Sequence, residues 1–132
     1  ALHLVNTGVP HAVLFVRRLE AVEPSALGAV IRHHRFFKPG GTNVDWVQIH
    51  SAHRISLRTY ERGVEAETLA CGTGVVASVL IGTALGHLRP PVHVRTRGGE
   101  ILTVGFRQEP RPWEGLYLEG PAKILFEGTY RG

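Results

Sequence analysis

Short apolar runs separated by turn residues make up much of the sequence. Residues 2–6 and 12–16 are two such runs, too short for helices, on either side of a turn that contains glycine and proline. Residues 43–50 and 54–60 alternate apolar with polar side chains and are rich in β-branched and aromatic residues, a pattern typical of paired strands. Four further strands are expected after residue 90, at 92–96, 100–106, 115–119 and 121–127.

Two segments have the pattern of helices. Pro24 suits the first turn of a helix. Leu27, Val30 and Ile31 then recur at helical spacing until the sequence KPGG, which predicts a surface helix with one buried stripe. Residues 73–86 are apolar on every side and end in a glycine, which predicts a helix that is buried all round. Together, the predicted strands and helices favour an α+β fold, with a mixed, mostly antiparallel β-sheet rolled around a central apolar helix.

The length of 132 residues fits a single domain, residues 1–132, able to bury roughly two thirds of its unfolded surface. No apolar run is long enough to cross a bilayer, and the N-terminus lacks the pattern of a secretory signal. We therefore expect a cytoplasmic protein with no membrane partner. The chain contains no methionine, so we expect it to be part of a longer protein.

The positive net charge and the histidines raise the question of whether the protein binds a nucleic acid or a metal ion. The net charge of +4 and the pI near 9.8 would suit a nucleic-acid partner, but the arginines are scattered and form no basic stripe. Of the eight histidines, His33 and His34 are adjacent on a predicted helix and point in different directions. His50 and His53 have no carboxylate or cysteine at ligand spacing. We expect neither a nucleic-acid partner nor a metal site.

Cys71, the only cysteine, lies immediately before the apolar helix. It cannot form an internal disulfide, so it is either a small buried residue or a reactive thiol. The first N–H groups of the helix favour a thiolate and can lower a cysteine pKa from about 8.5 to roughly 3.5–7.5. They can also bind a ligand carboxylate, and Gly72 and Gly74 lack the Cβ atoms that would block its approach. The N-terminus of this helix could therefore hold both a substrate and a base.

The motifs around this cysteine resemble those of one enzyme family. The run RTYERGVEAETLACGTG, together with GTNVDWV, TGVPHAV and LEGPAKILFEG, is similar to the C-terminal half of diaminopimelate epimerase over nearly the whole chain. The resemblance implies a cofactor-free enzyme that interconverts LL- and meso-diaminopimelate in lysine and peptidoglycan precursor biosynthesis. It also implies that the N-terminal domain of the same enzyme is a partner, because the active site lies between two similar domains. A homodimer is compatible with it, although Phe126 stands where some relatives have a tyrosine.

The same resemblance implies roles for individual residues. Cys71 matches one of two opposed cysteines that remove and return the α-proton on opposite faces of the substrate. His11 matches a histidine beside this pair, suited to orienting or tuning a thiolate. The resemblance places Glu61 among the catalytic residues. Glu61 and Arg62 together could bind the ammonium and the carboxylate group of one zwitterion. The positions expected to contact substrate are Asn43, Glu61, Arg62, Gly72 and Thr73.

Two departures from the family pattern change the expectation. Val9 stands where many relatives have an asparagine, so one substrate contact is missing. The second cysteine of the family lies in the N-terminal domain, and this chain has no other cysteine. The isolated chain is therefore expected to be half an active site and inactive.

Other functions remain open. A non-catalytic module could capture a carboxylate or phosphate at the same helix N-terminus, and other isomerases of the fold, such as proline racemases and phenazine-biosynthesis isomerases, are alternatives. Residues 72–77 match a dinucleotide fingerprint, but Arg97 stands where an acidic residue would be needed. The chain's two lysines, Lys38 and Lys123, lie near no glycine-rich phosphate site, which disfavours pyridoxal phosphate as a cofactor.

Overall fold

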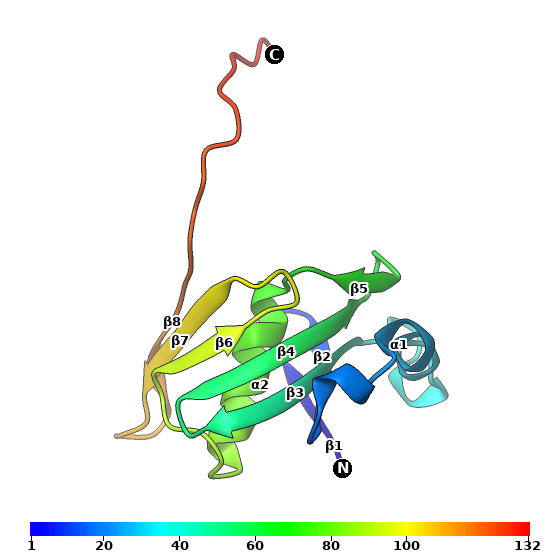
Figure 1. Ribbon diagram of the computed structural model, residues 1–132, viewed down its shortest axis with the longest axis vertical. Coiled ribbons are helices and arrows are strands. Elements are labelled where there is room, and N and C mark those ends of the chain that lie inside the picture. Colours follow the sequence, from blue (N-terminus) through cyan, green and yellow to red (C-terminus); the bar gives the residue numbers. More distant parts are fainter.

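In the computed structural model, which describes residues 1–132, a curled sheet wraps around one central helix (Figure 1). The strand order is β1-β2-β3-β4-β6-β7-β8, and β5 pairs with β4. The strands are β1 Leu2–Asn6, β2 Pro10–Phe15, β3 Asn43–Ser51, β4 Arg54–Glu61, β5 Ala66–Thr68, β6 Val92–Arg95, β7 Ile101–Arg107 and β8 Glu114–Glu119. The helices are α1 Pro24–Arg32 and α2 Gly72–Ala84, with short 3₁₀ turns η1 Leu19–Ala21 and η2 Arg35–Phe37.

The sheet is mixed and mostly antiparallel. Only the pairs β2–β3 and β4–β6 are parallel, and each is connected through a helix, as parallel neighbours require. The remaining pairs are antiparallel, and β3–β4 is the longest of them. The predicted fold class is confirmed, and β5 is a strand that the sequence pattern did not predict.

Helix α2 is the centre of the core, as predicted. Val75, Ala77 and Val79 are completely buried and pack with Val13 and Val47 of the sheet. Strands cover most sides of the helix, which explains its apolar residues, while Val76 and Leu80 on the remaining side are only partly buried. The helix is 13 residues long, and the chain has no helix with the length and apolar character to span a bilayer.

Helix α1 is present, but of the predicted buried stripe only Ile31 packs against the core, and there only in part. Leu27 and Val30 are 50% and 69% exposed, and the buried residues of the helix are Pro24 and Gly28. A Cβ atom at Gly28 would lie 2.5 Å from Cβ of Tyr60. The helix therefore packs on β4 through its smallest residue, because close approach of the backbone leaves no room for a side chain.

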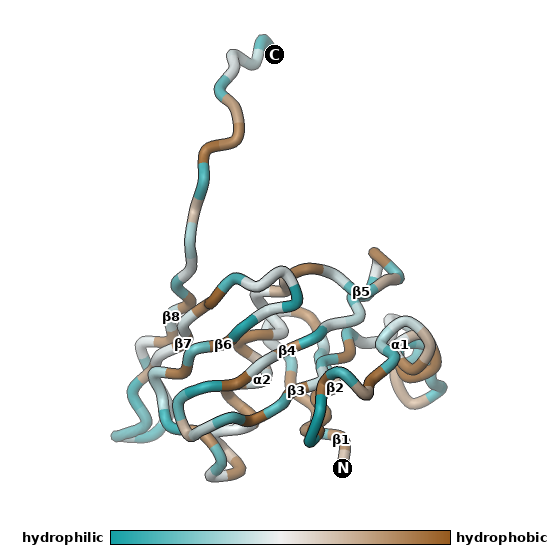
Figure 2. The backbone as a smooth tube through the Cα atoms, in the orientation of Figure 1, coloured by the Kyte–Doolittle hydropathy of each residue, from teal (hydrophilic) through white to brown (hydrophobic).

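The predicted strand at 121–127 is not formed. The last strand ends at Glu119, and the following residues extend away from the sheet (Figure 1). Figure 2 shows that this tail carries hydrophobic residues, and Ile124, Leu125 and Phe126 are about four fifths exposed. A strand needs hydrogen bonds to a neighbouring strand, and the tail pairs with none, although β1 and β8 are the edge strands of the sheet.

Candidate active site

Cys71 lies at the point where the loop after β5 enters α2. It is the N-cap residue, with extended backbone angles, and no side chain caps the helix. Its Sγ atom lies 3.5 Å from Thr73 Oγ1. Only 8% of the residue is exposed, so the thiol is part of the interior at the edge of the core.

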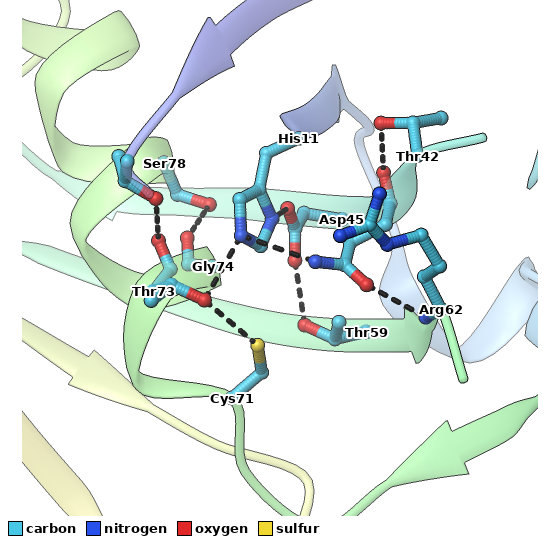
Figure 3. A network of polar contacts seen from close by, with 11 residues as sticks. His11, Thr42, Asp45, Thr59, Arg62, Cys71, Thr73, Gly74 and Ser78 are labelled. Atoms are coloured by element: carbon cyan, nitrogen blue, oxygen red, sulfur yellow. Dashed lines mark hydrogen bonds and ion pairs between the residues drawn. The ribbon is translucent and has the colours of Figure 1, made fainter. Parts of the chain in front are cut away.

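A buried histidine–aspartate pair lies next to this helix terminus (Figure 3). His11 of β2 and Asp45 of β3 come from neighbouring parallel strands, and both are completely inaccessible to solvent. Nδ1 of His11 lies 2.6 Å from Oδ2 of Asp45. The other carboxylate oxygen accepts a hydrogen bond of 2.7 Å from the Thr59 hydroxyl of β4. The Asp45 carboxylate is therefore held on both of its oxygens.

The second ring nitrogen of His11 connects this pair to the cysteine. Nε2 lies 3.0 Å from Thr73 Oγ1, the same hydroxyl that contacts Cys71 Sγ, and 3.4 Å from Nδ2 of Asn43. The amide of Asn43 is oriented because its Oδ1 accepts a hydrogen bond of 2.6 Å from the backbone N–H of Arg62. An unbroken line of polar contacts thus runs from the aspartate to the thiol.

Gly74 permits this arrangement. A Cβ atom at this position would lie 3.3 Å from Cε1 of His11 and 3.2 Å from Cγ of Asp45, and closer still to the carboxylate oxygen Oδ1. The first turn of α2 therefore approaches the histidine–aspartate pair directly, with no side chain between them. The Ser78 hydroxyl donates to the carbonyl of Gly74 one turn later, which fixes the same part of the helix.

Burial, and not the helix N-terminus, dominates the electrostatics of the cysteine. Removal from water raises the pKa of the Cys71 thiol above its ordinary value, because the thiolate is the form that loses hydration. Hydrogen bonds from Thr73 and Gly74 oppose this effect, and the negative charges of Asp45 and Glu61 reinforce it. The predicted lowering of the pKa is therefore wrong for this chain, since the amide contacts do not outweigh the cost of burial.

Most of the residues singled out from the sequence meet at this point. His11, Asn43, Cys71 and Thr73 belong to one network of contacts, and Gly72 opens the helix beside them. Of the remaining two, Arg62 joins the network through its backbone N–H alone, and Glu61 makes no side-chain hydrogen bond to it.

Arg62 contributes its backbone N–H to Asn43, while its guanidinium donates to the carbonyl of Gly40 at 3.4 Å. The carboxylate of Glu61 makes no hydrogen bond or ion pair within this chain and acts on Cys71 only through its charge. Both charged groups are therefore available to a ligand, since neither pairs with another ionised side chain of the chain.

Asp45 and Thr59 are parts of the site that sequence reasoning missed. Asp45 stands at a polar position in the alternating strand pattern, which suggests a solvent-facing residue. In the structure, however, the first five residues of β3 are buried on both faces. The available signal was an acidic residue directly between two large apolar residues, Val44 and Trp46.

A groove runs along the open side of α2, between the two edge strands of the sheet. Gly72 and Thr73 lie at one end of it, and Val76 and Leu80 form its floor. The other lining residues come from β1 and the loop after it and from β8: Asn6, Thr7, Leu116 and Leu118. In an α-helix the first N–H groups have no intrahelical partner, so the amides of Gly72 and Thr73 can bind an anionic group at this end of the groove.

The fold has counterparts among solved structures. A phenazine biosynthesis protein of the PhzF family from Bacillus anthracis matches 77% of this chain and 31% of its own, with a TM-score of 0.53 and 20% identity. A PhzF-family protein from Enterococcus faecalis matches 76% of this chain and 35% of its own, with a TM-score of 0.55 and 18% identity. These likenesses define the fold class alone: a mixed sheet wrapped around a central helix.

Sequence comparison then assigns the family within this fold. The family model described as diaminopimelate epimerase matches residues 3–125. A diaminopimelate epimerase of Chlorobaculum tepidum is 44% identical over 128 residues, and one of Aquifex aeolicus is 46% identical over 125 residues. The chain belongs to the diaminopimelate epimerase family. These two matches include 96% and 94% of this chain but only 49% and 44% of the relatives. The chain therefore spans about half the length of each relative.

Proposed function

We propose that this chain is the C-terminal catalytic half of a cofactor-independent diaminopimelate epimerase, a cytoplasmic enzyme in which Cys71 transfers a proton at the α-carbon. The observation that carries the proposal is the position of the Cys71 thiol at an uncapped helix N-terminus, where the exposed Thr73 hydroxyl connects it to the buried His11–Asp45 pair. Membership of the family and the length of the match support it.

The reaction requires an acid and a base on opposite faces of one carbon. In the proposed mechanism a thiolate on the N-terminal domain removes the α-proton, and the Cys71 thiol returns a proton from the other face. The raised pKa of Cys71 supports this assignment, because a buried thiol is protonated at neutral pH and can act as the donor. In the reverse direction the two sulfurs exchange roles.

Substrate binding uses the groups around the thiol. The amides of Gly72 and Thr73 would bind the carboxylate next to the reacting carbon and stabilise the negative charge that develops when the proton leaves. Glu61 and Arg62, whose charged groups are not paired with other ionised side chains, would contact the ammonium and carboxylate groups of diaminopimelate. Asn43 would contribute a further contact and, by its hydrogen bond to Arg62, keep that residue's backbone in place.

Deuterium exchange tests the proposal. The chain is joined to the N-terminal domain of a diaminopimelate epimerase, and NMR in D₂O follows exchange at the α-carbon of diaminopimelate. We expect exchange in the assembled protein, none in the isolated chain, and none in assembled Cys71→Ala. Glu100→Gln, which alters an exposed carboxylate in the turn before β7, is the matched control and should exchange normally.

Three outcomes would contradict the proposal. Exchange by the isolated chain would show that one cysteine suffices, and exchange by assembled Cys71→Ala would remove the thiol from the mechanism. If the assembled protein binds diaminopimelate without exchange and Cys71→Ser binds it equally well, the chain is a carboxylate-binding module with a structural cysteine. Exchange of proline in place of diaminopimelate would indicate the related racemase activity.

A further inference from the structure

The contacts around His11 determine which of its ring nitrogens carries a proton. The Asp45 carboxylate accepts hydrogen bonds and cannot donate when ionised, so the 2.6 Å contact requires a proton on Nδ1 of His11. On the other side of the ring, the Asn43 amide is fixed by the backbone N–H of Arg62, which turns its Nδ2 protons toward Nε2. A neutral His11 with a bare Nε2 satisfies both sides of the ring.

We propose that Asp45 is a positioning residue for the reaction, an inference that rests on the proposed function and that nothing in the family motifs assigns. It fixes His11 in the tautomer whose Nε2 is an acceptor. Thr73 then connects this nitrogen to the thiol, since its hydroxyl lies 3.0 Å from Nε2 and 3.5 Å from Cys71 Sγ.

Proton transfer along this line is balanced. The S–H proton of Cys71 moves to Thr73 Oγ1 while the proton of that hydroxyl moves to Nε2 of His11. The S–H and O–H bonds break, and a new O–H and a new N–H bond form. The products are a thiolate and an imidazolium whose Nδ1–H still donates to the Asp45 carboxylate, and the reverse movement restores the thiol. No other reactant is needed.

Few charged groups face the thiol from the elements around it. Asp45 comes from β3 and Glu61 from the end of β4, and Arg97 after β6 lines the small space beside Cys71. Helix α2 itself contains no charged residue. The imidazolium formed on His11 would therefore be the closest cation connected to the thiolate by hydrogen bonds.

This arrangement gives Asp45 an effect opposite in sign to simple charge repulsion. As a bare negative charge, Asp45 raises the pKa of the Cys71 thiol, so its neutralisation should make the thiol react faster. As a positioning residue it keeps the proton acceptor in place. An asparagine at position 45 could donate to Nδ1 and shift the His11 proton to Nε2, which should make the thiol react more slowly.

The test is the alkylation of Cys71 by iodoacetamide in the chain and in Asp45→Asn, over a series of pH values. We expect the Asp45→Asn thiol to react about tenfold more slowly near pH 7.5, which corresponds to a pKa rise of about one unit. Glu100→Gln, which removes an exposed carboxylate, should react like the unmodified chain. An Asp45→Asn rate that is equal or faster overturns the inference.

Two further measurements keep the test decisive if Asp45→Asn fails to fold. The ¹⁵N shifts of His11 in the unmodified chain should show a protonated Nδ1 and a bare Nε2. The reversed tautomer overturns the inference. Thr73→Val should slow alkylation and Thr73→Ser should restore it, because only the hydroxyl connects sulfur to nitrogen; equal rates in both variants would also overturn it.

Neither readout uses substrate turnover, which separates this inference from the proposed function. If the assembled protein fails to exchange the α-proton while Asp45→Asn slows alkylation, the function is wrong and the positioning role stands. If exchange occurs and Asp45→Asn does not slow alkylation, the function stands and the positioning role is wrong.

Discussion

Replacing Gly74 with alanine tests whether the helix terminus and the histidine–aspartate pair are packed as closely as the structure indicates. The new Cβ would lie 3.2 Å from Cγ of Asp45 and closer to its Oδ1, below the 3.4 Å at which ordinary contact begins. The carboxylate cannot easily move away, because Thr59 holds one oxygen at 2.7 Å and His11 holds the other at 2.6 Å. The first turn of the helix is therefore overpacked against the carboxylate, and one of these hydrogen bonds is lost.

The expected cost follows from these contacts. Overpacking of an interior costs about 1–3 kcal/mol, and loss of a hydrogen bond to a charged group costs about 1.5–3 kcal/mol. Alanine gains about 1 kcal/mol over glycine inside a helix, which offsets part of this cost. The free energy of unfolding of Gly74→Ala should therefore be lower by roughly 1.5–5 kcal/mol.

Urea unfolding followed by tryptophan fluorescence measures this difference, and the same helix supplies the control. A Cβ at Gly72 would meet only the far end of the exposed Leu118 side chain, at 3.1 Å, so Gly72→Ala should change stability by less than about 0.5 kcal/mol. In an Asp45→Ala background, the cost of Gly74→Ala should fall by more than about 1 kcal/mol, since the carboxylate it meets is gone. A Gly74→Ala chain that is more stable, as helix propensity alone predicts, would refute the reasoning.

Three other changes have expected outcomes. Gly28→Ala should lower the free energy of unfolding by about 1–3 kcal/mol in the same assay, because its Cβ would overlap the Tyr60 side chain, whereas a neutral or stabilising effect would mean that α1 packs less closely. The pKa of Tyr60 is raised by burial and by the charge of Glu65, so ultraviolet titration should show a phenol that ionises above pH 10 and is absent in Tyr60→Phe. Because the pKa of Tyr60 is higher in the folded than in the unfolded state, its contribution to the free energy of unfolding should be complete below pH 10 and be lost as pH rises through the folded-state pKa. Ionisation of Tyr60 at the ordinary pH of a tyrosine would contradict this. Deletion of residues 121–132 should change the unfolding free energy by less than about 0.5 kcal/mol, since the side chains there are exposed, and a larger loss would reveal contacts of the tail with the sheet.

The elements that the sequence predicted well are those whose pattern reflects their own surroundings. Residues of α2 are mostly apolar because strands cover most sides of the helix. The paired strands β3 and β4 were likewise evident from their alternating and β-branched residues.

The errors arose where packing depends on something other than apolar character. Helix α1 contacts β4 through Gly28, so its apolar residues Leu27 and Val30 remain exposed, and no periodicity could show this. Residues 121–127 have the composition of a strand, but a strand also needs a free edge, and the chain offers none that the tail reaches. Composition reports what a segment can form, while the partner decides whether it does.

In the candidate site, too, some residues could be predicted from the sequence, while the position of others depends on how the elements pack. The motif around Cys71 predicted the helix terminus, and the motifs TGVPHAV and GTNVDWV predicted His11 and Asn43 by their resemblance to the family, but Asp45 looked like the polar position of an alternating strand. Its burial follows from β3 being covered on both faces, which depends on where α1, η1 and α2 lie. Neither this covering nor the approach of Gly74 could be inferred before the elements were assembled.

The raised pKa of Cys71 and a two-cysteine mechanism are compatible, although the first expectation was a thiolate at this position. Inversion at carbon by two thiols requires one protonated and one ionised sulfur at the same time, and a negative charge on one sulfur raises the pKa of the other. Burial on this side biases Cys71 toward the protonated form. In the proposed mechanism, the buried His11, which contacts the Thr73 hydroxyl, would take the proton when the direction of the reaction is reversed. A site that must work in both directions needs both features: a thiol that holds its proton in the resting state and a neighbour that can take it.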